Sequence, residues 1–203
     1  MPIYPLFPEP IYFSKLERSL TKEELKMVNK YKKKTSKNVG GNTFTYDNQI
    51  LEHKTLKHLK KDLYKMIMDY FNKIVCPPNP LIPYISQSWF NYTQPGERHH
   101  NHAHPNSYIS GVLYIAANKE VDRIKFHKTG YERIRLEATQ FNMYNSRSWW
   151  YPVGTADVVL FPSYLVHGVD TAQGPKTRTS LSFNVFIKGN LGSKKEITEL
   201  IIE

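Results

Sequence analysis

Three histidines of this 203-residue chain have the spacing of metal ligands. His102 and His104 form a His-x-His pair, and on an extended strand residues i and i+2 point to the same face. An imidazole nitrogen binds a divalent metal at about 2.0–2.1 Å, so two rings on one face can share an ion. His167 follows Asp157–Pro162, a segment with the texture of a buried strand, and lies just beyond its end. The three residues predict a metal site, and we expect the adjacent His99 and His100 to line its mouth or face solvent.

Arg178 opens a β-branched and aromatic segment that follows His167 in the chain. On a strand, Arg178, Ser180 and Ser182 would share one face. An arginine on an inner face is costly unless an anion pairs with it, and a carboxylate held through two parallel hydrogen bonds would meet that need. The pattern therefore predicts a bound carboxylate in the same interior as the histidines.

Two helices are predicted before residue 76. Thr21-Lys-Glu-Glu24 has the form of a capping box, which predicts a helix from Thr21 to about Lys34. A second helix is expected over roughly 52–75, where apolar residues recur at helical spacing. Cys76 and the prolines after it should end this helix, and we expect Cys76 to be buried as a small apolar residue.

From residue 81 onward the chain has the pattern of β-structure. Short segments rich in β-branched and aromatic residues alternate with turn signals that contain Gly, Pro and Asn. Strands at this spacing predict a sandwich or barrel with the helices packed against its outside. The expected strands are Tyr84–Tyr92, Ser107–Ala117, Arg123–His127, Thr139–Tyr144, Asp157–Pro162 and Thr179–Lys188.

Composition narrows the class of protein. Hydrophobic residues make up 40% and charged residues 23% of the chain, which is enough apolar material for a globular core. No apolar run approaches the roughly 20 residues that cross a bilayer, and the start of the chain lacks the features of a secretory signal. A single cysteine excludes an intramolecular disulfide and a cysteine-cluster zinc finger. We therefore expect one domain in a reducing, cytoplasmic setting.

The net charge of +10 is concentrated in residues 1–75, around Lys30, Lys32, Lys33, Lys34 and Lys37. Such a surface could attract a nucleic acid or another polyanion. A solvated helix end that favours cations is the simpler interpretation, because no nucleic-acid-binding motif accompanies the charge. We do not expect nucleic acid as a partner.

Over roughly residues 84–188, the sequence resembles the iron(II)/2-oxoglutarate-dependent oxygenases, in particular small family members from bacteria and phages. The order and spacing are similar to that family's HxD/E…H…RxS signature. The resemblance implies a mainly β fold with N-terminal helices, and a double-stranded β-helix (jelly-roll, cupin-like) core. The residues on which this resemblance is based are Ser88-Trp-Phe-Asn91, Gly96, His102-Ala-His104-Pro105, Ser107, Ser110-Gly-Val-Leu-Tyr114, Phe161-Pro-Ser163, His167 and Arg178-Thr-Ser180-Leu-Ser-Phe-Asn184.

The implied organisation is a single domain over 1–203. A helical support would occupy 1–80, the β-helix core 81–190 and a C-terminal tail 191–203.

The resemblance also implies a ligand set for iron. His102 would be the first ligand and His167 the distal one. His104 stands where the wider superfamily usually has Asp or Glu. Two alternatives stay open: His104 is a third nitrogen ligand, which we favour, or it stands aside and a water takes its place. A three-histidine site can bind ferrous iron.

Five further residues match places where similar enzymes hold 2-oxoglutarate. Arg178 would pair with the distal carboxylate, and Ser180 would be a second donor. Tyr114 and Tyr92 match phenol positions of prolyl-hydroxylase-type enzymes, although both could simply pack the barrel. Asn91 is a further candidate, which could instead bond to the backbone.

The implied activity is that of a dioxygenase using Fe(II), 2-oxoglutarate and O2. It would hydroxylate an unidentified substrate, with a prolyl-hydroxylase-like reaction as one form, and release succinate and CO2. No residue beyond the metal centre is required as an acid, base or nucleophile. A homodimer is compatible with this function, as is a location in the host cytoplasm if the chain is viral.

Three other functions compete with this one. A zinc hydrolase or hydratase also uses three histidines, but it leaves Arg178 and Ser180 unexplained. A cupin-type dioxygenase could use iron without 2-oxoglutarate. A non-catalytic jelly-roll binding module would leave the histidines without a role.

Overall fold

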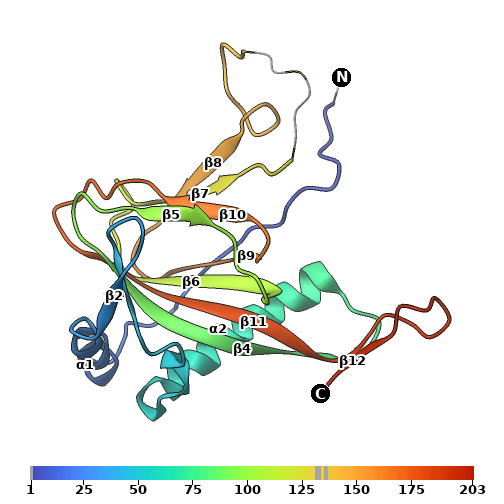
Figure 1. Ribbon diagram of the computed structural model, residues 1–203, viewed down its shortest axis with the longest axis horizontal. Helices are drawn as coiled ribbons and strands as arrows, with labels where there is room; N and C mark the ends of the chain where they lie inside the picture. Colours follow the sequence, from blue (N-terminus) through green and yellow to red (C-terminus); the bar gives the residue numbers. More distant parts are fainter. Residues whose placement is uncertain (1, 131–133, 135–136) are drawn as a thin grey trace.

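Two antiparallel sheets and two α-helices make up the computed structural model, which describes residues 2–130, 134 and 137–203 (Figure 1). The larger sheet has the strand order β1-β9-β6-β11-β4-β3-β2, and β12 pairs with β11. Its strands are β1 (Tyr12–Lys15), β2 (Thr35–Lys37), β3 (Thr43–Thr45), β4 (Leu81–Thr93), β6 (Ile109–Ala116), β9 (Asp157–Pro162), β11 (Arg178–Leu191) and β12 (Leu200–Ile202). The smaller sheet, in the order β5-β10-β7-β8, contains β5 (His99–His102), β7 (Arg123–His127), β8 (Ser148–Pro152) and β10 (Val166–Val169).

The first helix, α1 (Lys22–Tyr31), begins with the predicted capping box. The Glu24 N–H donates to the Thr21 hydroxyl at 3.2 Å, and the Thr21 N–H donates to the Glu24 carboxylate at 2.8 Å. Two of the orphan donors at the start of the helix are satisfied in this way. The helix ends at Tyr31, three residues before the predicted end, because the chain turns there into β2.

The second helix, α2 (Lys57–Tyr70), lies inside the predicted span and buries Leu59, Leu63, Ile67 and Tyr70. Two short 3₁₀ turns, Ile50–Glu52 and Lys54–Leu56, precede it, and a π turn, Phe71–Val75, follows it. The four buried residues of α2 recur every three or four positions, which is the period of one helix face. No helix in the described part of the chain is long and apolar enough to cross a bilayer.

Cys76 corrects a prediction, because it is exposed rather than buried. Its backbone is left-handed, with φ at +43°, and ends the π turn. The thiol donates to the Asn72 carbonyl oxygen at 2.9 Å. The change of direction before the prolines carries this side chain to the surface instead of into the core.

Most predicted strands exist, but Thr139–Tyr144 is not one of them. The next strand in the chain is β8, which begins a few residues later and pairs with β7. In the intervening segment, the Asn142 side-chain oxygen accepts from the Tyr144 N–H at 2.9 Å, and the Asn145 side-chain oxygen accepts from the Asn142 N–H at 2.8 Å. Asparagine side chains that bond the local backbone in this way favour turns over a strand.

The N-terminal third is not only helical, since it also contributes β1, β2 and β3 to the larger sheet. The C-terminal segment likewise adds β12 to β11. The division into a helical support, a core and a tail therefore needs this correction, while the mainly β class with N-terminal helices is confirmed.

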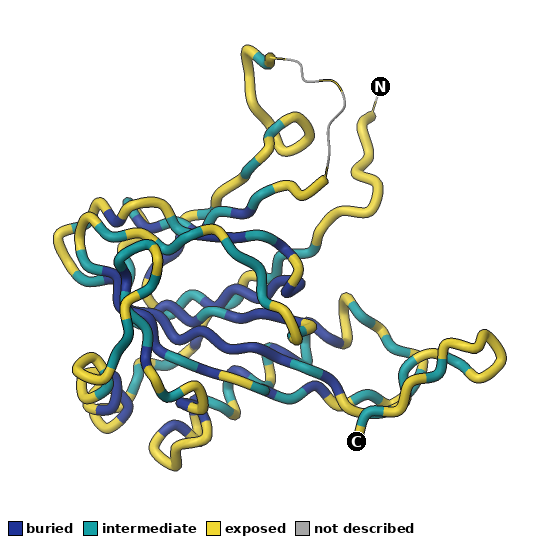
Figure 2. Tube along the Cα trace, in the orientation of Figure 1, coloured by how far each residue is buried: buried dark blue, intermediate teal, exposed yellow. Residues whose placement is uncertain are grey.

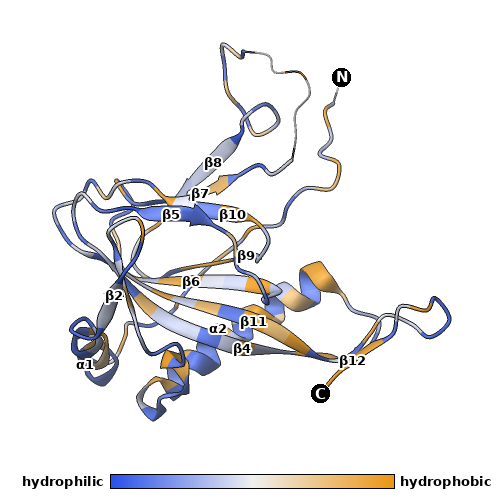
Figure 3. Ribbon diagram, in the orientation of Figure 1, coloured by the Kyte–Doolittle hydropathy of each residue, from blue (hydrophilic) through white to orange (hydrophobic). Residues whose placement is uncertain are grey.

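Buried apolar side chains form two clusters on opposite sides of the larger sheet. The larger cluster joins α1 and α2 to one face of that sheet. The smaller one lies between the two sheets and includes Tyr114, Phe126 and Phe161. Strands β6 and β11 are buried along most of their length (Figure 2). In contrast, β5 is hydrophilic (Figure 3). The space between the sheets is therefore apolar at the smaller cluster and polar beside β5.

Candidate metal centre and cosubstrate pocket

The three predicted metal ligands lie together at one end of the space between the sheets. His102 is the last residue of β5 and pairs directly with His167 of β10. Residues directly opposite each other in an antiparallel pair present their side chains on the same face. His104 follows β5, and its N–H donates to the Ser163 carbonyl oxygen at 2.9 Å, which anchors the segment. The ligand nitrogens of the three rings all lie within 4.8 Å of one another.

Backbone carbonyls orient two of these rings. Nδ1 of His102 lies 2.8 Å from the His100 carbonyl oxygen, and Nδ1 of His167 lies 3.0 Å from the Leu165 carbonyl oxygen. A carbonyl oxygen only accepts, so each Nδ1 carries the hydrogen and donates it. The neutral ring then leaves the Nε2 lone pair free for a metal, which is the usual arrangement behind a ligating histidine.

Burial keeps the three rings neutral. It lowers the pKa of His167 to about 3 and that of His104 to about 4, and the nearby rings add to the effect. Burial also lowers the pKa of His102. Because a protonated imidazole cannot bind a metal, these shifts keep the ligands competent at neutral pH. Three neutral imidazoles suit divalent iron, nickel, copper or zinc.

Arg178, the first residue of β11, is buried at the other end of this space. Its Nη1 lies 3.3 Å from the Asp122 carboxylate, and its Nη2 donates to the Thr93 hydroxyl at 3.2 Å. Asp122 is itself held by the Asn118 N–H at 2.8 Å. The predicted need for an anion is thus met within the chain by Asp122, which the sequence analysis missed.

Between the two ends lie polar side chains from three neighbouring strands. Ser180 of β11 is paired with Asn91 of β4 on one side and with Tyr114 of β6 on the other. The Asn91 amide nitrogen donates to the Ser182 hydroxyl at 2.9 Å, while its buried side-chain oxygen has no hydrogen-bond partner among the described residues. Burial raises the pKa of Tyr114, so its phenol stays protonated. The structure therefore brings Asn91, Tyr114 and Ser180 to the same interior as Arg178.

Tyr92 is not part of this interior, which corrects the expectation that it binds the cosubstrate. Its hydroxyl donates to the Val28 carbonyl oxygen of α1 at 2.6 Å, and its ring belongs to the cluster between the helices and the larger sheet. The neighbours of Tyr92 on β4, Asn91 and Thr93, line the interior. Side chains alternate along a strand, so Tyr92 faces the helices.

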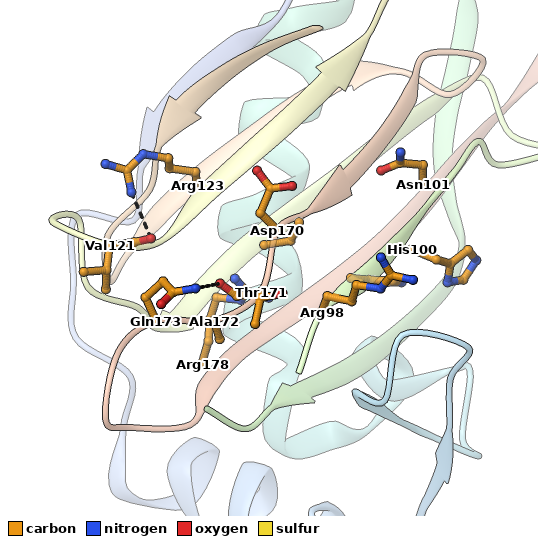
Figure 4. Close-up of a pocket in the computed structure, with 12 residues that line it drawn as sticks. Arg98, His100, Asn101, Val121, Arg123, Asp170, Thr171, Ala172, Gln173 and Arg178 are labelled. Atoms are coloured by element: carbon orange, nitrogen blue, oxygen red, sulfur yellow. Dashed lines mark hydrogen bonds between the residues drawn. The ribbon is translucent and has the colours of Figure 1, made fainter. Parts of the chain in front are cut away.

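Two adjoining cavities are present here. The inner one, about 30 Å³, lies among the histidine triad, Tyr114 and Arg178. The outer one, about 540 Å³, opens beside Arg178 and is bordered by Arg98, Arg123 and Asp170 (Figure 4). Among the described residues, His99, Val169 and Arg178 line both cavities.

His99 therefore lies where the inner cavity opens into the outer one, which agrees with the prediction that it lines the mouth of the site. It is half-buried, and burial together with the neighbouring His102 lowers its pKa to about 2. His99, His100 and His102 also come within 4.8 Å of one another. His102 belongs to both histidine groups, but its Nδ1 donates to the His100 carbonyl oxygen and only its Nε2 can bind a metal. The two groups therefore cannot each hold a metal ion through His102 at the same time.

Comparison with known proteins identifies the family. Residues 87–184 match the family model described as "Putative 2OG-Fe(II) oxygenase". This segment of the chain matches the 2OG-Fe(II) oxygenase family. No curated protein sequence matches this chain.

Solved structures share its fold. A prolyl-4-hydroxylase from Pseudomonas putida is 11% identical, with 87% of this chain and 92% of that chain covered and a TM-score of 0.53. A Trichoplax adhaerens prolyl hydroxylase is 12% identical, with coverage of 87% and 83% and a TM-score of 0.57. HygX from Streptomyces hygroscopicus, solved with nickel and 2-oxoglutarate bound, is 10% identical, with coverage of 87% and 82% and a TM-score of 0.56. The predicted double-stranded β-helix fold is thereby confirmed.

Proposed function

We propose that this oxygenase uses Fe(II), 2-oxoglutarate and O2 to hydroxylate a C–H bond of an organic substrate. The observation that carries the proposal is the register of β5 against β10, which sets His102 opposite His167 with His104 beside them. When bound, iron and 2-oxoglutarate supply the oxidising chemistry, in which the cosubstrate is converted to succinate and CO2.

The protein's own part is to hold the metal and leave room around it. His102, His104 and His167 would hold the metal through three imidazole nitrogens and would leave further coordination positions for exogenous ligands. His102 and His167 are kept in one orientation by their backbone carbonyl partners. We assign ligation to His104 as well, because its ring lies among the other two.

Arg178 is the proposed partner of the distal carboxylate of 2-oxoglutarate. Its guanidinium has five N–H donors, and Asp122 and Thr93 each accept from one nitrogen, so donors remain for a bound anion. Ser180, Tyr114 and Asn91 are proposed to supply further hydrogen bonds along the cosubstrate. The apolar walls formed by Phe161 and its neighbours keep water away from the reacting atoms.

A three-histidine metal protein that does not use 2-oxoglutarate is the second candidate. It is favoured by the Asp122–Arg178 ion pair, which gives Arg178 a partner without any ligand. A zinc hydrolase would also need a general base, and no carboxylate is among the described residues that line the inner cavity. We therefore prefer the oxygenase, in a reducing cytoplasmic compartment that keeps iron ferrous.

An anaerobic titration separates the two candidates. The Fe(II)-loaded protein is titrated with 2-oxoglutarate while the weak metal-to-ligand absorption band is followed, and O2 is then admitted and succinate is measured. A saturable band followed by succinate supports the oxygenase. Tight iron binding with no band and no succinate would contradict it. Mass shifts of one oxygen in candidate extracts, including proline-containing peptides, would then identify the substrate.

A further inference from the structure

His99 lies at the boundary between the inner and the outer cavity. It is the first residue of β5 and pairs with Val169 of β10. Its ring stacks on that of His102, with the ring centroids 4.7 Å apart and an angle of 24° between the planes. Arg178 lines the same two cavities. A dicarboxylate that reaches from the metal ligands to Arg178 would therefore pass beside His99.

Asn38 decides which nitrogen of His99 carries the hydrogen. The side-chain nitrogen of Asn38 lies 3.1 Å from Nε2 of His99, and the side-chain oxygen of Asn38 accepts from the Val39 N–H at 2.8 Å. Because the oxygen is used by the backbone, the amide nitrogen faces the ring and donates to it. Nε2 of the neutral ring is then the acceptor, and Nδ1 carries the hydrogen. His99 thus has a donor nitrogen that Asn38 does not use.

The turn between β2 and β3 is closely fitted to β5, which holds Asn38 in place. The Arg98 N–H donates to the Gly40 carbonyl oxygen at 3.0 Å, and the Gly41 N–H donates to the Asn38 carbonyl oxygen at 3.0 Å. A side chain at Gly40 would place its Cβ 2.2 Å from the Arg98 carbonyl oxygen. Gly41 has φ at +93°, a conformation that favours glycine. The Gly40-Gly41 pair therefore allows the approach that sets Asn38 against His99.

We propose that His99 binds the cosubstrate through Nδ1–H, as a second donor beside Arg178 to a carboxylate of 2-oxoglutarate. In this proposal, Asn38 positions the His99 ring. This inference rests on the proposed function. Asp122 and Thr93 already take part of the hydrogen-bonding capacity of Arg178. A neutral imidazole adds a donor without adding a positive charge that would repel the nearby metal ion.

The first test compares His99→Phe with His100→Phe. Phenylalanine keeps a ring that can stack on His102 but has no donor. His100 is the matched control, because its side chain borders only the outer cavity. In the anaerobic Fe(II) titration, His99→Phe should bind 2-oxoglutarate at least about tenfold more weakly, which is the lower end of the range for a hydrogen bond to a charged group. His100→Phe should stay within about twofold of the wild type, and the Fe(II) affinity without cosubstrate should not change in either variant.

A double-mutant cycle tests whether Asn38 acts through His99. Asn38→Ala should weaken 2-oxoglutarate binding in the wild type and have no further effect in His99→Phe. Asn38→Asp reverses the contact, since a carboxylate accepts from Nε2–H and moves the hydrogen away from Nδ1. In ¹⁵N-histidine spectra of the Zn²⁺-loaded protein, His99 should change tautomer in Asn38→Asp. The control is His53, whose Nε2 lies 2.6 Å from the Asp47 carboxylate and which should not change.

The outcomes separate this inference from the proposed function. If wild type binds 2-oxoglutarate and Arg178→Ala does not, yet His99→Phe binds like the wild type, the role of His99 is overturned and the oxygenase stands. Additive effects of Asn38→Ala and His99→Phe would overturn the positioning role. If the Fe(II)-loaded wild type fails to bind 2-oxoglutarate, the proposed function and this inference both fall.

Discussion

The two ends of the inner cavity are held in different ways. At the metal end, His102 and His167 are fixed by backbone carbonyls two residues before them in the chain. At the anion end, Arg178 is fixed by the side chains of Asp122 and Thr93, which are far from it in sequence. Each ring at the metal end is therefore oriented by its own segment, although strand pairing brings the two rings together, whereas Arg178 at the anion end is oriented by side chains of two other segments.

The largest effect should come from breaking the metal end. His167→Ala removes one of three nitrogen ligands, and we expect Fe(II) affinity to fall more than about 100-fold, beyond what the loss of an outer-shell partner costs. The fold should survive, because the alanine leaves the surrounding apolar cluster in place. Isothermal titration with Fe(II) under argon measures the affinity, and circular dichroism checks the fold. Wild-type affinity in this variant would rule out His167 as a ligand.

The next effect concerns the anion end. An arginine–carboxylate pair that is shielded from water typically loses about 2–5 kcal/mol when one partner is truncated, so Arg178→Ala should weaken 2-oxoglutarate binding by roughly 30-fold or more. Arg178→Lys should recover only part of this, because an ammonium lacks the planar fork. Fe(II) affinity without cosubstrate should stay unchanged. An unaltered 2-oxoglutarate affinity in Arg178→Ala would favour the second candidate function.

His104 should have an intermediate effect, because no backbone carbonyl of the described residues accepts a hydrogen bond from its ring. We expect His104→Ala to weaken Fe(II) by about tenfold, a value in the lower part of the range for supporting groups of a metal site. His104→Asp should bind iron well, since it restores the carboxylate that the wider superfamily uses. Binding of Fe(II) to His104→Ala as tightly as to the parent would mean that His104 is not a ligand.

Asp122→Asn tests how much the ion pair at the anion end contributes to the stability of the fold. It leaves the buried guanidinium of Arg178 without its negative partner but keeps a side chain that can accept a hydrogen bond. Breaking a buried ion pair costs about 3–5 kcal/mol, and we expect the lower part of that range here. The melting temperature should fall by about 6–12 °C in the absence of ligand. In the Fe(II)-loaded protein, 2-oxoglutarate should raise it more than in the wild type, because the cosubstrate carboxylate replaces the lost charge. A melting temperature equal to that of the wild type would mean that the ion pair does not matter for the fold.

The difference between the ends also explains what the sequence could predict. The His-x-His pair, His167 and the inward face of Arg178 follow from the two-residue period of strands and from local motifs, and the structure brings them together. Asp122 and Asn38 could not be found in this way. Their roles depend on contacts with Arg178 and His99 across 56 and 61 positions of the chain, and no local pattern encodes such a contact. The prediction that Tyr92 binds the cosubstrate was wrong because side chains alternate along β4, and this alternation turns Tyr92 toward α1.

Tyr92 of β4 and Tyr114 of β6, the strands on either side of β11, give the smallest expected effect and a direct check of that alternation. Tyr92→Phe removes the hydrogen bond to the Val28 carbonyl oxygen, which keeps the Lys32 N–H as a donor at 3.3 Å, so the free energy of unfolding should fall by about 1 kcal/mol. Its affinity for 2-oxoglutarate should not change, because the hydroxyl faces the helices. Tyr114→Phe should behave in the opposite way, with nearly unchanged stability and cosubstrate binding weakened a few-fold, because its ring lines the inner cavity. Urea unfolding and the anaerobic titration, applied to both variants, measure the two quantities. If Tyr92→Phe weakened 2-oxoglutarate binding and Tyr114→Phe did not, the assignment of the two faces of the sheet would be reversed.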